Sequence, residues 1–149
     1  IFRWSGIYGP KQHSLEKIRT GKDFTISNNK HFFSRIHVTD ICKTIIASIG
    51  KPSYGEVFNV SDDLPAPINT VQQFSAKALN RHPLKEISVE EANLSEQAKR
   101  FFLDNKKVSN DKIKNFFDLK LDHPNYKSGV LRELERIVEQ YDKNCNTKT

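Results

Sequence analysis

The residues best suited to chemistry lie in one short apolar stretch, FFSRIHVTD, which contains Arg35, His37 and Asp40. An arginine within an apolar strand must direct its guanidinium to solvent, a carboxylate or a phosphate. Arg35 therefore either pairs with an acidic residue or contacts an anionic ligand. His37 and Asp40 could form a His–Asp pair, but no nucleophile accompanies them. The spacing favours instead a hydrogen-bonded, half-buried His37 and an Asp40 that caps the following helix.

Other common catalytic and ligand-binding motifs are missing from the sequence. The six glycines form neither a G-x-G-x-x-G turn nor a Walker phosphate loop, and Ser5-Gly6 lacks the second glycine of a nucleophile elbow. The five histidines and two cysteines have no spacing typical of metal ligands. We therefore expect no metal site, and we interpret Cys42 and Cys145 as free thiols in a reducing compartment, with Cys42 in the core.

The composition is that of a globular protein. Its 149 residues can form one domain with a core. No apolar run approaches the roughly 20 residues of a transmembrane helix, and the cytoplasm is the expected compartment. The formal net charge of +6 could indicate an anionic partner. Because acidic residues interrupt the lysines of 99–120, we favour a solvated basic face over a nucleic-acid site.

An α/β layer is needed to position Arg35 and His37. The strand–helix–strand order of the surrounding segments is typical of such a layer. Its expected elements are a strand over 1–8, buried on both faces and ended by Gly9-Pro10, a strand over 31–38, a helix over 40–49 and a strand over 56–60.

Helices dominate the expected structure beyond residue 65. Hydrophobic periodicity and capping signals predict their positions. The remaining expected elements of the chain are a helix over 14–20, a strand over 23–27, a helix opened by a Thr70–Gln73 capping box, a strand over 85–89, a helix opened by an Asn93–Glu96 capping box, a helix from 109 or 110, an edge strand over 118–124 and a long helix capped by Asn125. We divide the chain into late strands with their helix (1–64), a mainly helical lobe (65–142) and a frayed tail (143–149).

Four segments occur in an order that resembles one enzyme family: FRWSGIYGP, FSRIHVTDI, GEVFNVSDDLP and NKKVSNDKI. Over residues 1–140 the chain resembles the C-terminal half of extended or atypical short-chain dehydrogenase/reductases, the NAD-dependent epimerase/dehydratase group. The resemblance implies an α/β fold, with a partial Rossmann-type layer of late strands and one helix plus a small, mainly helical α+β substrate lobe. The implied function is substrate binding within an NAD(P)-dependent epimerase, dehydratase or reductase, an oxidoreductase or isomerase.

The same resemblance implies where ligands would lie. Tyr8, Gly9 and Pro10 would form the loop that borders the nicotinamide end of the cofactor, whereas Arg35 and His37 would contact the substrate at the junction with its lobe. The chain has neither the Gly-rich turn nor the Tyr-x-x-x-Lys pair of the family, so no catalytic residue is expected in it. NAD or NADP would bind the intact parent enzyme and not this chain alone.

One departure from the family bears on the substrate. Nucleotide-sugar members commonly carry a phosphate-binding arginine at the position of Phe33, and this chain has Arg35 two residues later. This favours an atypical member with an unassigned substrate. The expected partners are a sugar-like small molecule and a missing N-terminal Rossmann half, with Ile1 marking a cut, and exposed strands would favour self-association. The alternative is a stand-alone binding or interaction domain derived from such an enzyme.

Overall fold

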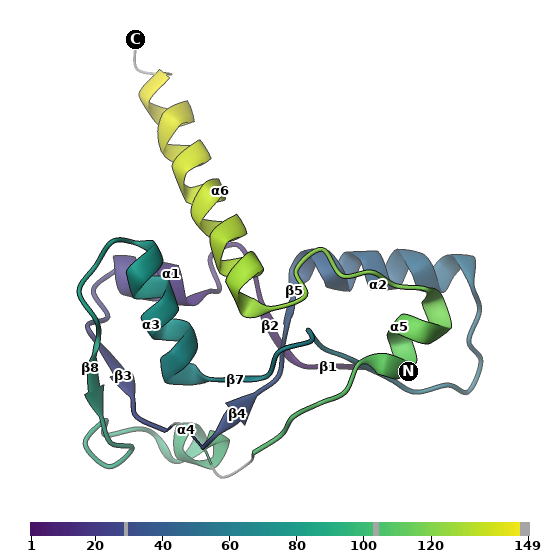
Figure 1. Cartoon of the computed structure of the whole chain (residues 1–149), viewed down its shortest axis with the longest axis horizontal. Coiled ribbons are helices and arrows are strands. Elements are labelled where there is room, and N and C mark those ends of the chain that lie inside the picture. Colours follow the sequence, from purple (N-terminus) through teal and green to yellow (C-terminus); the bar gives the residue numbers. More distant parts are fainter. Residues whose placement is uncertain (29, 103–104, 147–149) are drawn as a thin grey trace.

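The computed structural model describes residues 1–28, 30–102 and 105–146. Short strands and helices alternate, and the described strands pair into two-stranded ladders, mostly parallel (Figure 1). This mixed α/β architecture confirms the predicted class, a partial Rossmann-like fold. Its elements are β1 (Phe2–Trp4), β2 (Gly6–Tyr8), α1 (Ser14–Arg19), β3 (Phe24–Ile26), β4 (Phe32–Phe33), β5 (Arg35–His37), α2 (Val38–Gly50), β6 (Phe58–Val60), β7 (Ala66–Pro67), α3 (Ile68–Ala78), β8 (Lys85–Ile87), α4 (Glu96–Phe101), α5 (Asp111–Phe117) and α6 (Tyr126–Asn146). Among the described helices, none is both long enough and apolar enough to cross a membrane.

The N-terminal segment forms two strands instead of one. β1 pairs in parallel with β6, and β2 pairs in parallel with β5. The amide of Ser5 donates to Val60 O, at the end of β6. The next amide, that of Gly6, donates to Ser34 O, directly before β5. The prediction of a single strand buried on both faces is wrong, because the backbone changes partner at Ser5 and because Trp4 and Ile7 are 38% and 52% exposed.

The segment over 31–38 is divided in the same way. β4 pairs antiparallel with β7, whereas β5 pairs with β2. Ser34 lies between the two strands, and its hydroxyl accepts a hydrogen bond from the Val108 amide at 2.9 Å. The single strand predicted here is therefore two short strands of different ladders. The strand–helix–strand order of the prediction is retained as β5, α2 and β6.

His37, rather than Thr39 or Asp40, caps α2. Its Nδ1 accepts a hydrogen bond from the Thr39 amide at 3.2 Å. Asp40 is fully buried in the first turn of the helix, and its two carboxylate oxygens accept from the amides of Asp122 at 2.7 Å and His123 at 3.0 Å. The prediction of Asp40 as a helix cap is wrong, because its side chain bonds a distant loop instead of its own helix.

That loop replaces the edge strand predicted over 118–124. Leu119 and Leu121 are buried in a cluster with Phe58 and Ile113, but the structure assigns no strand to these residues. The alternating pattern that suggested a strand comes from two leucines that reach the core from a loop. The amides that follow them bond Asp40 in place of a neighbouring strand.

Two hydrophobic clusters form most of the core. The first lies between β5, β6, α5 and the loop before α6, and the second lies between α1, β7, α3 and α6. Their buried members are Ile36, Phe58, Val60, Ile113, Leu119 and Leu121 in the first cluster and Leu15, Ala66, Val71, Tyr126 and Val130 in the second. The buried positions predicted for α1 are confirmed at Leu15 and Ile18.

One apolar stripe of α2 is exposed. Ile41 packs against the first cluster, whereas Ile45, Ile46 and Ile49 are 44%, 69% and 76% exposed. Cys42 is exposed as well, so its predicted place in the core is wrong: it points away from the face on which Ile41 packs. Exposed apolar surface of this kind marks a place where another element packs or a partner binds.

The capping boxes predicted for α3 and α4 do not form. α3 begins two residues before Thr70, and the Gln73 side chain instead exchanges two hydrogen bonds with the Leu84 backbone, both 2.9 Å. Ser95 caps α4 in place of Asn93. Because the Gln73 side chain bonds this distant backbone, it does not cap its own helix.

The cap predicted for α6 is confirmed. Oδ1 of Asn125 accepts from the amides of Lys127 at 3.0 Å and Ser128 at 3.2 Å. α6 then continues through Asn146, well into the predicted tail, and 147–149 lie outside the described residues. In Figure 1 the later turns of α6 project away from the other elements.

Candidate functional site

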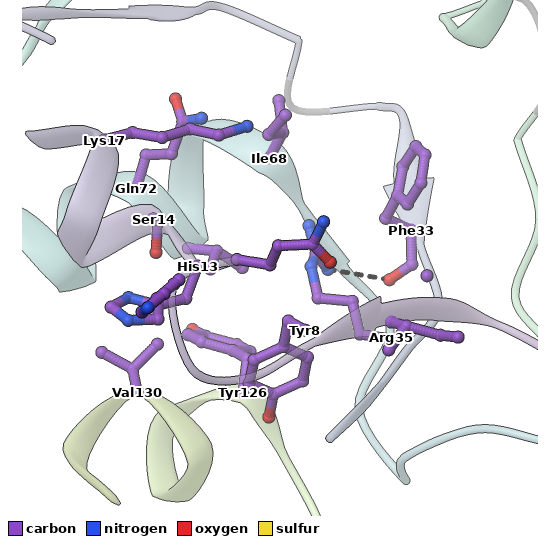
Figure 2. A pocket seen from close by; sticks show the side chains of 15 residues that line it. Tyr8, His13, Ser14, Lys17, Phe33, Arg35, Ile68, Gln72, Tyr126 and Val130 are labelled. Carbon is purple, nitrogen blue, oxygen red and sulfur yellow. Dashed lines mark hydrogen bonds between the residues drawn. The ribbon is translucent and has the colours of Figure 1, made fainter. Parts of the chain in front are cut away.

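Two ladders and three helices surround a cavity of about 440 Å³ (Figure 2). β2 and the loop that follows it supply one wall, α1 and α3 a second, and the start of α6 a third. This volume lies within the range of small-molecule sites. The cavity is lined by Gly6, Ile7, Tyr8, Lys11, Gln12, His13, Ser14, Lys17, Phe33, Arg35, Ile68, Val71, Gln72, Tyr126 and Val130.

The lining of the cavity is basic. Lys11, Lys17 and Arg35 contribute to it, and none of its lining residues is an aspartate or glutamate. In the part of the chain that the structure describes, neither lysine lies within ion-pair distance of a carboxylate. Positive charge on the lining of a concave site favours an anionic ligand.

Arg35 reaches into this cavity from β5. Its Nη1 donates to Phe33 O at 2.9 Å and to Ala66 O at 2.8 Å, and the guanidinium lies 5.5 Å from the centroid of the Phe33 ring. Burial lowers the pKa of Arg35 and Asp62 partly offsets this effect, but a guanidinium stays protonated in proteins. Among the described residues no carboxylate pairs with it directly. Of the two alternatives that the sequence left open, this geometry favours contact with an anion.

A buried carboxylate joins two helix N-termini behind the cavity. Glu133 of α6 is 1% exposed. Its Oε1 lies 3.0 Å from Nε2 of His37, and its Oε2 lies 3.8 Å from Nε2 of His13. Nδ1 of each histidine accepts a hydrogen bond from a backbone amide in the first turn of the helix that follows it. Each neutral imidazole therefore carries its proton on Nε2, the nitrogen that faces Glu133. Burial lowers the pKa of both histidines.

Tyr8 forms the inner wall of the cavity through close contact with α6. Its ring lies edge-on to His37, with centroids 5.1 Å apart, and Figure 2 shows its hydroxyl pointing toward α6. A Cβ built on Gly129 would lie 2.7 Å from Cε2 and Cζ of Tyr8 and closer still to the hydroxyl. Glycine is therefore required at position 129. Burial raises the pKa of Tyr8 above its usual range.

The structure brings together only some of the site residues expected from the sequence. Tyr8 and Arg35 line the cavity, whereas Gly9, Pro10 and His37 do not. His37 is fully buried and Gly9 is also buried, so only Pro10 of these three presents a side chain to solvent. His37 can thus influence a ligand in this cavity only through the residues that it supports.

The loop after β2 is closed by its own backbone. Gly9 and Gln12 exchange two backbone hydrogen bonds, 3.0 and 3.3 Å long, so the amides of these two residues are already used. The hydroxyl of Tyr8 faces α6 and not this loop (Figure 2). Of the three residues expected to border the nicotinamide, Pro10 is the exposed one.

Several residues of the site were missed in the sequence, among them the two lysines Lys11 and Lys17. Glu133 had a detectable signal, since it occupies the apolar face of α6 between Val130 and Leu134, where a charge needs a buried partner. His13 precedes a helix and could have been recognised as a cap. Gln72 of α3, which lines the cavity, had no such signal.

A second, smaller cavity lies on the other side of Phe33. It measures about 310 Å³ and is lined by Arg3, Trp4, Ser5, Phe32, Phe33, Ser34, Asn59, Lys106 and Val108. The NKKVSN segment builds its outer wall: Asn105 accepts from the Phe32 amide at 2.9 Å and donates to Lys30 O at 2.8 Å. The segment singled out in the sequence therefore serves first to hold this wall against β4.

Comparison with solved structures identifies similar proteins. A conserved protein of unknown function from Silicibacter pomeroyi is 35% identical, with a TM-score of 0.86, over 91% of this chain and 48% of its own. dTDP-glucose 4,6-dehydratase from Bacillus anthracis, in complex with NAD, is 21% identical (TM-score 0.69) over 96% of this chain and 44% of its own. The human epimerase family protein SDR39U1, with NADPH, is 19% identical (TM-score 0.71) over 90% and 47%.

Two other comparisons gave no match: no protein-family model and no curated protein is similar to this chain. The chain spans about half the length of the solved structures that it resembles. It therefore has part of the fold that NAD-dependent epimerase/dehydratase proteins and their short-chain dehydrogenase/reductase relatives share.

Proposed function

We propose that this chain is the C-terminal, substrate-binding part of an NAD(P)-dependent enzyme of the epimerase, dehydratase or reductase type, with the larger cavity as its substrate site. The observation that carries the proposal is that nearly all of this chain matches less than half of each similar protein. The position of the cavity agrees with this, since Lys11 and Gln12 follow the carboxyl end of β2 and α/β sheets bind ligands at that end of their strands.

The partner in this proposal is an N-terminal Rossmann half. That half would bind NAD or NADP and provide the catalytic residues, so this chain would not be competent alone. Two exposed features support such a partner. β1 pairs on one side with β6 and with no other described strand, and Ile45, Ile46 and Ile49 form an exposed apolar stripe on α2. Unpaired strand edges and apolar faces of this kind are covered in stable proteins.

A stand-alone binding domain is the second candidate. It is favoured by the fact that residues of this chain alone enclose the larger cavity and supply its three cations. In that case the chain would bind an anionic small molecule without any redox partner. The two candidate functions predict different effects of NAD and NADP on the thermal stability of the protein.

The test is a fusion of this chain behind the unmatched part of the Silicibacter pomeroyi protein, with the undivided bacterial protein as a control. Thermal unfolding is followed with and without NAD or NADP. We expect either cofactor to raise the Tm of the fusion and to leave the isolated chain unchanged, because ligands stabilise only the state that binds them.

Two results would contradict the proposal. Strong stabilisation of the isolated chain by NAD or NADP would show that no second half is needed. A cofactor that stabilises the undivided bacterial protein but not a folded fusion would favour the stand-alone domain. Circular dichroism establishes whether the fusion has folded before the cofactors are compared.

A further inference from the structure

We propose that His13, His37 and Glu133 form a proton-sensitive latch, which holds the first turns of α1 and α2 while both imidazoles are neutral and releases them when the imidazoles are protonated. The latch joins α1, α2 and α6, and α1 supplies one wall of the larger cavity. The inference does not rest on the proposed function, because it concerns only contacts within this chain.

Each imidazole makes two contacts that need different nitrogens. Nδ1 of His13 accepts a hydrogen bond from the Glu16 amide at 3.3 Å. Nδ1 of His37 accepts one from the Thr39 amide at 3.2 Å. The Nε2 atoms of the two rings face different oxygens of Glu133, at 3.8 Å from His13 and 3.0 Å from His37. Only a neutral ring with its proton on Nε2 can accept through Nδ1 and present an N–H to a carboxylate through Nε2.

Protonation adds the new hydrogen at Nδ1, the nitrogen that accepts the backbone amide. An imidazolium has two N–H donors and no acceptor, so the amides of Glu16 and Thr39 would each face a donor in place of their acceptor. A first-turn amide that loses its cap must bond water or another group, and the helix start is less stable without the cap. The added charge therefore acts directly on the starts of both helices.

The surroundings of His13 keep its ring neutral and place it beside the cavity. The residue is 6% exposed and lines the larger cavity. Burial lowers the pKa of His13, the charges of Glu133 and Glu16 oppose this effect, and Arg19 adds to it. Because the ring borders the cavity, an imidazolium that has lost its bond to the Glu16 amide has a path toward water on that side.

His37 is fully buried among other titratable groups. Its ring lies edge-on to that of His123, with centroids 4.2 Å apart, and to that of Tyr8 at 5.1 Å. Burial lowers the pKa of His37, the hydrogen bond and charge of Glu133 oppose this effect, and His123 adds to it. The charge of Asp40, in the first turn of α2, also favours the protonated ring. In the folded chain the ring is thus neutral near pH 7, with its Nε2–H directed at Glu133.

Glu133 determines the pH at which the latch opens. The residue is 1% exposed, and Arg136 is a cation 3.7 Å from its carboxylate. A carboxylate beside an imidazole favours the charged form of the ring, so both histidines would be harder to protonate without this negative charge. A neutral amide at position 133 should therefore shift the release of both caps to lower pH.

Release of the cap on α1 would affect the larger cavity. Ser14 and Lys17 of α1 line the cavity together with His13, and Figure 2 shows the three side chains on the same side of it. A first turn without its cap no longer fixes the positions of these side chains. The cavity thus has its closed wall at neutral pH, and acid loosens that wall.

Nuclear magnetic resonance of the 149-residue chain tests the latch directly. At about pH 7.5 the nitrogen shifts of His13 and His37 should show the Nε2–H tautomer. As the pH falls, within the range in which circular dichroism shows a folded chain, the amide proton signals of Glu16 and Thr39 should move upfield with the midpoints of their rings. An Nδ1–H tautomer, amide signals that stay constant while the rings titrate, or rings that stay neutral until the chain unfolds would overturn the inference.

Substitutions assign each signal to its ring. His13→Asn keeps an oxygen for the Glu16 amide and does not titrate, so the Glu16 signal should become independent of pH while the Thr39 signal still moves. His82→Asn is the matched control, because His82 is exposed and lies outside the cavity, and it should leave both curves unchanged. A Glu16 signal that still moves in His13→Asn would overturn the role of His13.

Glu133→Gln tests the control of both caps by one carboxylate. We expect it to lower the midpoints of the two titrations by about 1 pH unit, and unchanged midpoints would overturn the role of Glu133. If this variant does not fold, His13→Asn still tests the cap of α1.

Hydrogen exchange tests the effect on the cavity wall. Relative to their intrinsic rates, the amides of α1 should exchange about tenfold faster at about pH 5 than at about pH 7.5, and His13→Asn should remove this difference. Equal protection at the two pH values would overturn the loosening of the wall. None of these measurements involves NAD or NADP, so their outcome is independent of the test of the proposed function.

Discussion

Glu133 lies 3.0 Å from His37, and this bond joins the longest helix of the protein to the N-terminus of α2. The second oxygen of Glu133 faces His13 at the start of α1, 3.8 Å away. The guanidinium of Arg136, 3.7 Å from Glu133, is the cation beside this carboxylate. One carboxylate thus connects three helices directly behind the wall formed by Tyr8.

Removal of this carboxylate should destabilise the whole chain. We expect Glu133→Ala to lower the free energy of unfolding by about 3 kcal/mol, because it leaves the Nε2–H of His37 buried without an acceptor. Glu133→Gln keeps an oxygen for His37 and should lose less than half as much. Urea unfolding followed by circular dichroism measures both. Equal losses for the two variants would contradict the importance of that bond.

The two buried histidines should make the chain less stable in acid. Burial lowers the pKa of His13 and His37, so below the unfolded value of about 6.5 the unfolded chain binds more protons than the folded one. Their contribution is therefore fully present above pH 6.5 and is lost as the pH falls through the lowered folded pKa. His13→Asn keeps a helix cap and should gain stability relative to the wild type as the pH falls from 7.5 to 5. A constant difference would contradict this.

Asp62 should act in the opposite direction. Burial raises its pKa to about 7, above the unfolded value of about 3.9, so between these values the folded chain binds more protons and stability falls as the pH rises. Asp62→Asn retains an oxygen for the Leu64 amide, which Oδ1 accepts at 3.3 Å. This variant should gain about 2 kcal/mol relative to the wild type between pH 5 and 8. Chemical unfolding at both pH values gives the comparison, and a loss at pH 8 would contradict it.

Gly129 and Gly50 offer a matched pair of glycine substitutions. Gly129→Ala should cost about 1–3 kcal/mol of stability, because the added methyl would overlap the ring of Tyr8. Gly50→Ala, also in a helix, meets nothing within 4 Å and should be neutral or stabilise by up to about 1 kcal/mol. Thermal unfolding distinguishes the two. Equal effects would show that helix propensity, and not contact with Tyr8, determines the result.

The exposed stripe on α2 should drive self-association of the isolated chain. Ile46→Lys and Ile49→Lys should shift sedimentation toward the monomer, while the free energy of unfolding changes by no more than about 0.5 kcal/mol. Leu131→Lys is the control, because Leu131 is 47% exposed but lies on α6. If all three variants reduce association equally, exposed apolar area in general is responsible and not this stripe.

The helices were predictable from the sequence because their signals are local. Leu15 and Ile18 in α1 have helical spacing and a glycine beyond the helix end, and Asn125 caps α6 through neighbouring amides. The strands were only partly predictable. The partner changes at Ser5 and Ser34 are decided by the backbone, and the pattern of side chains along each segment carries no mark of them.

The candidate site was predictable only in part for a similar reason. Arg35 stands out because an arginine interrupts an apolar strand. Asp40 looked like a helix cap, since nothing local indicates that its partners are the amides of Asp122 and His123. Lys11 and Lys17 carry no local mark of a site, because only the fold brings them to the cavity with Arg35.

The change of partner at Ser5 has a mechanical consequence. One uninterrupted stretch of backbone forms a strand of the β1–β6 ladder and, two residues after that strand ends, the wall of the larger cavity. Because Ser5 alone separates the two strands, a shift of β2 at the cavity would be passed along the backbone to β1 and its ladder with β6. The two parallel ladders of the N-terminal segment are thus joined covalently through one serine.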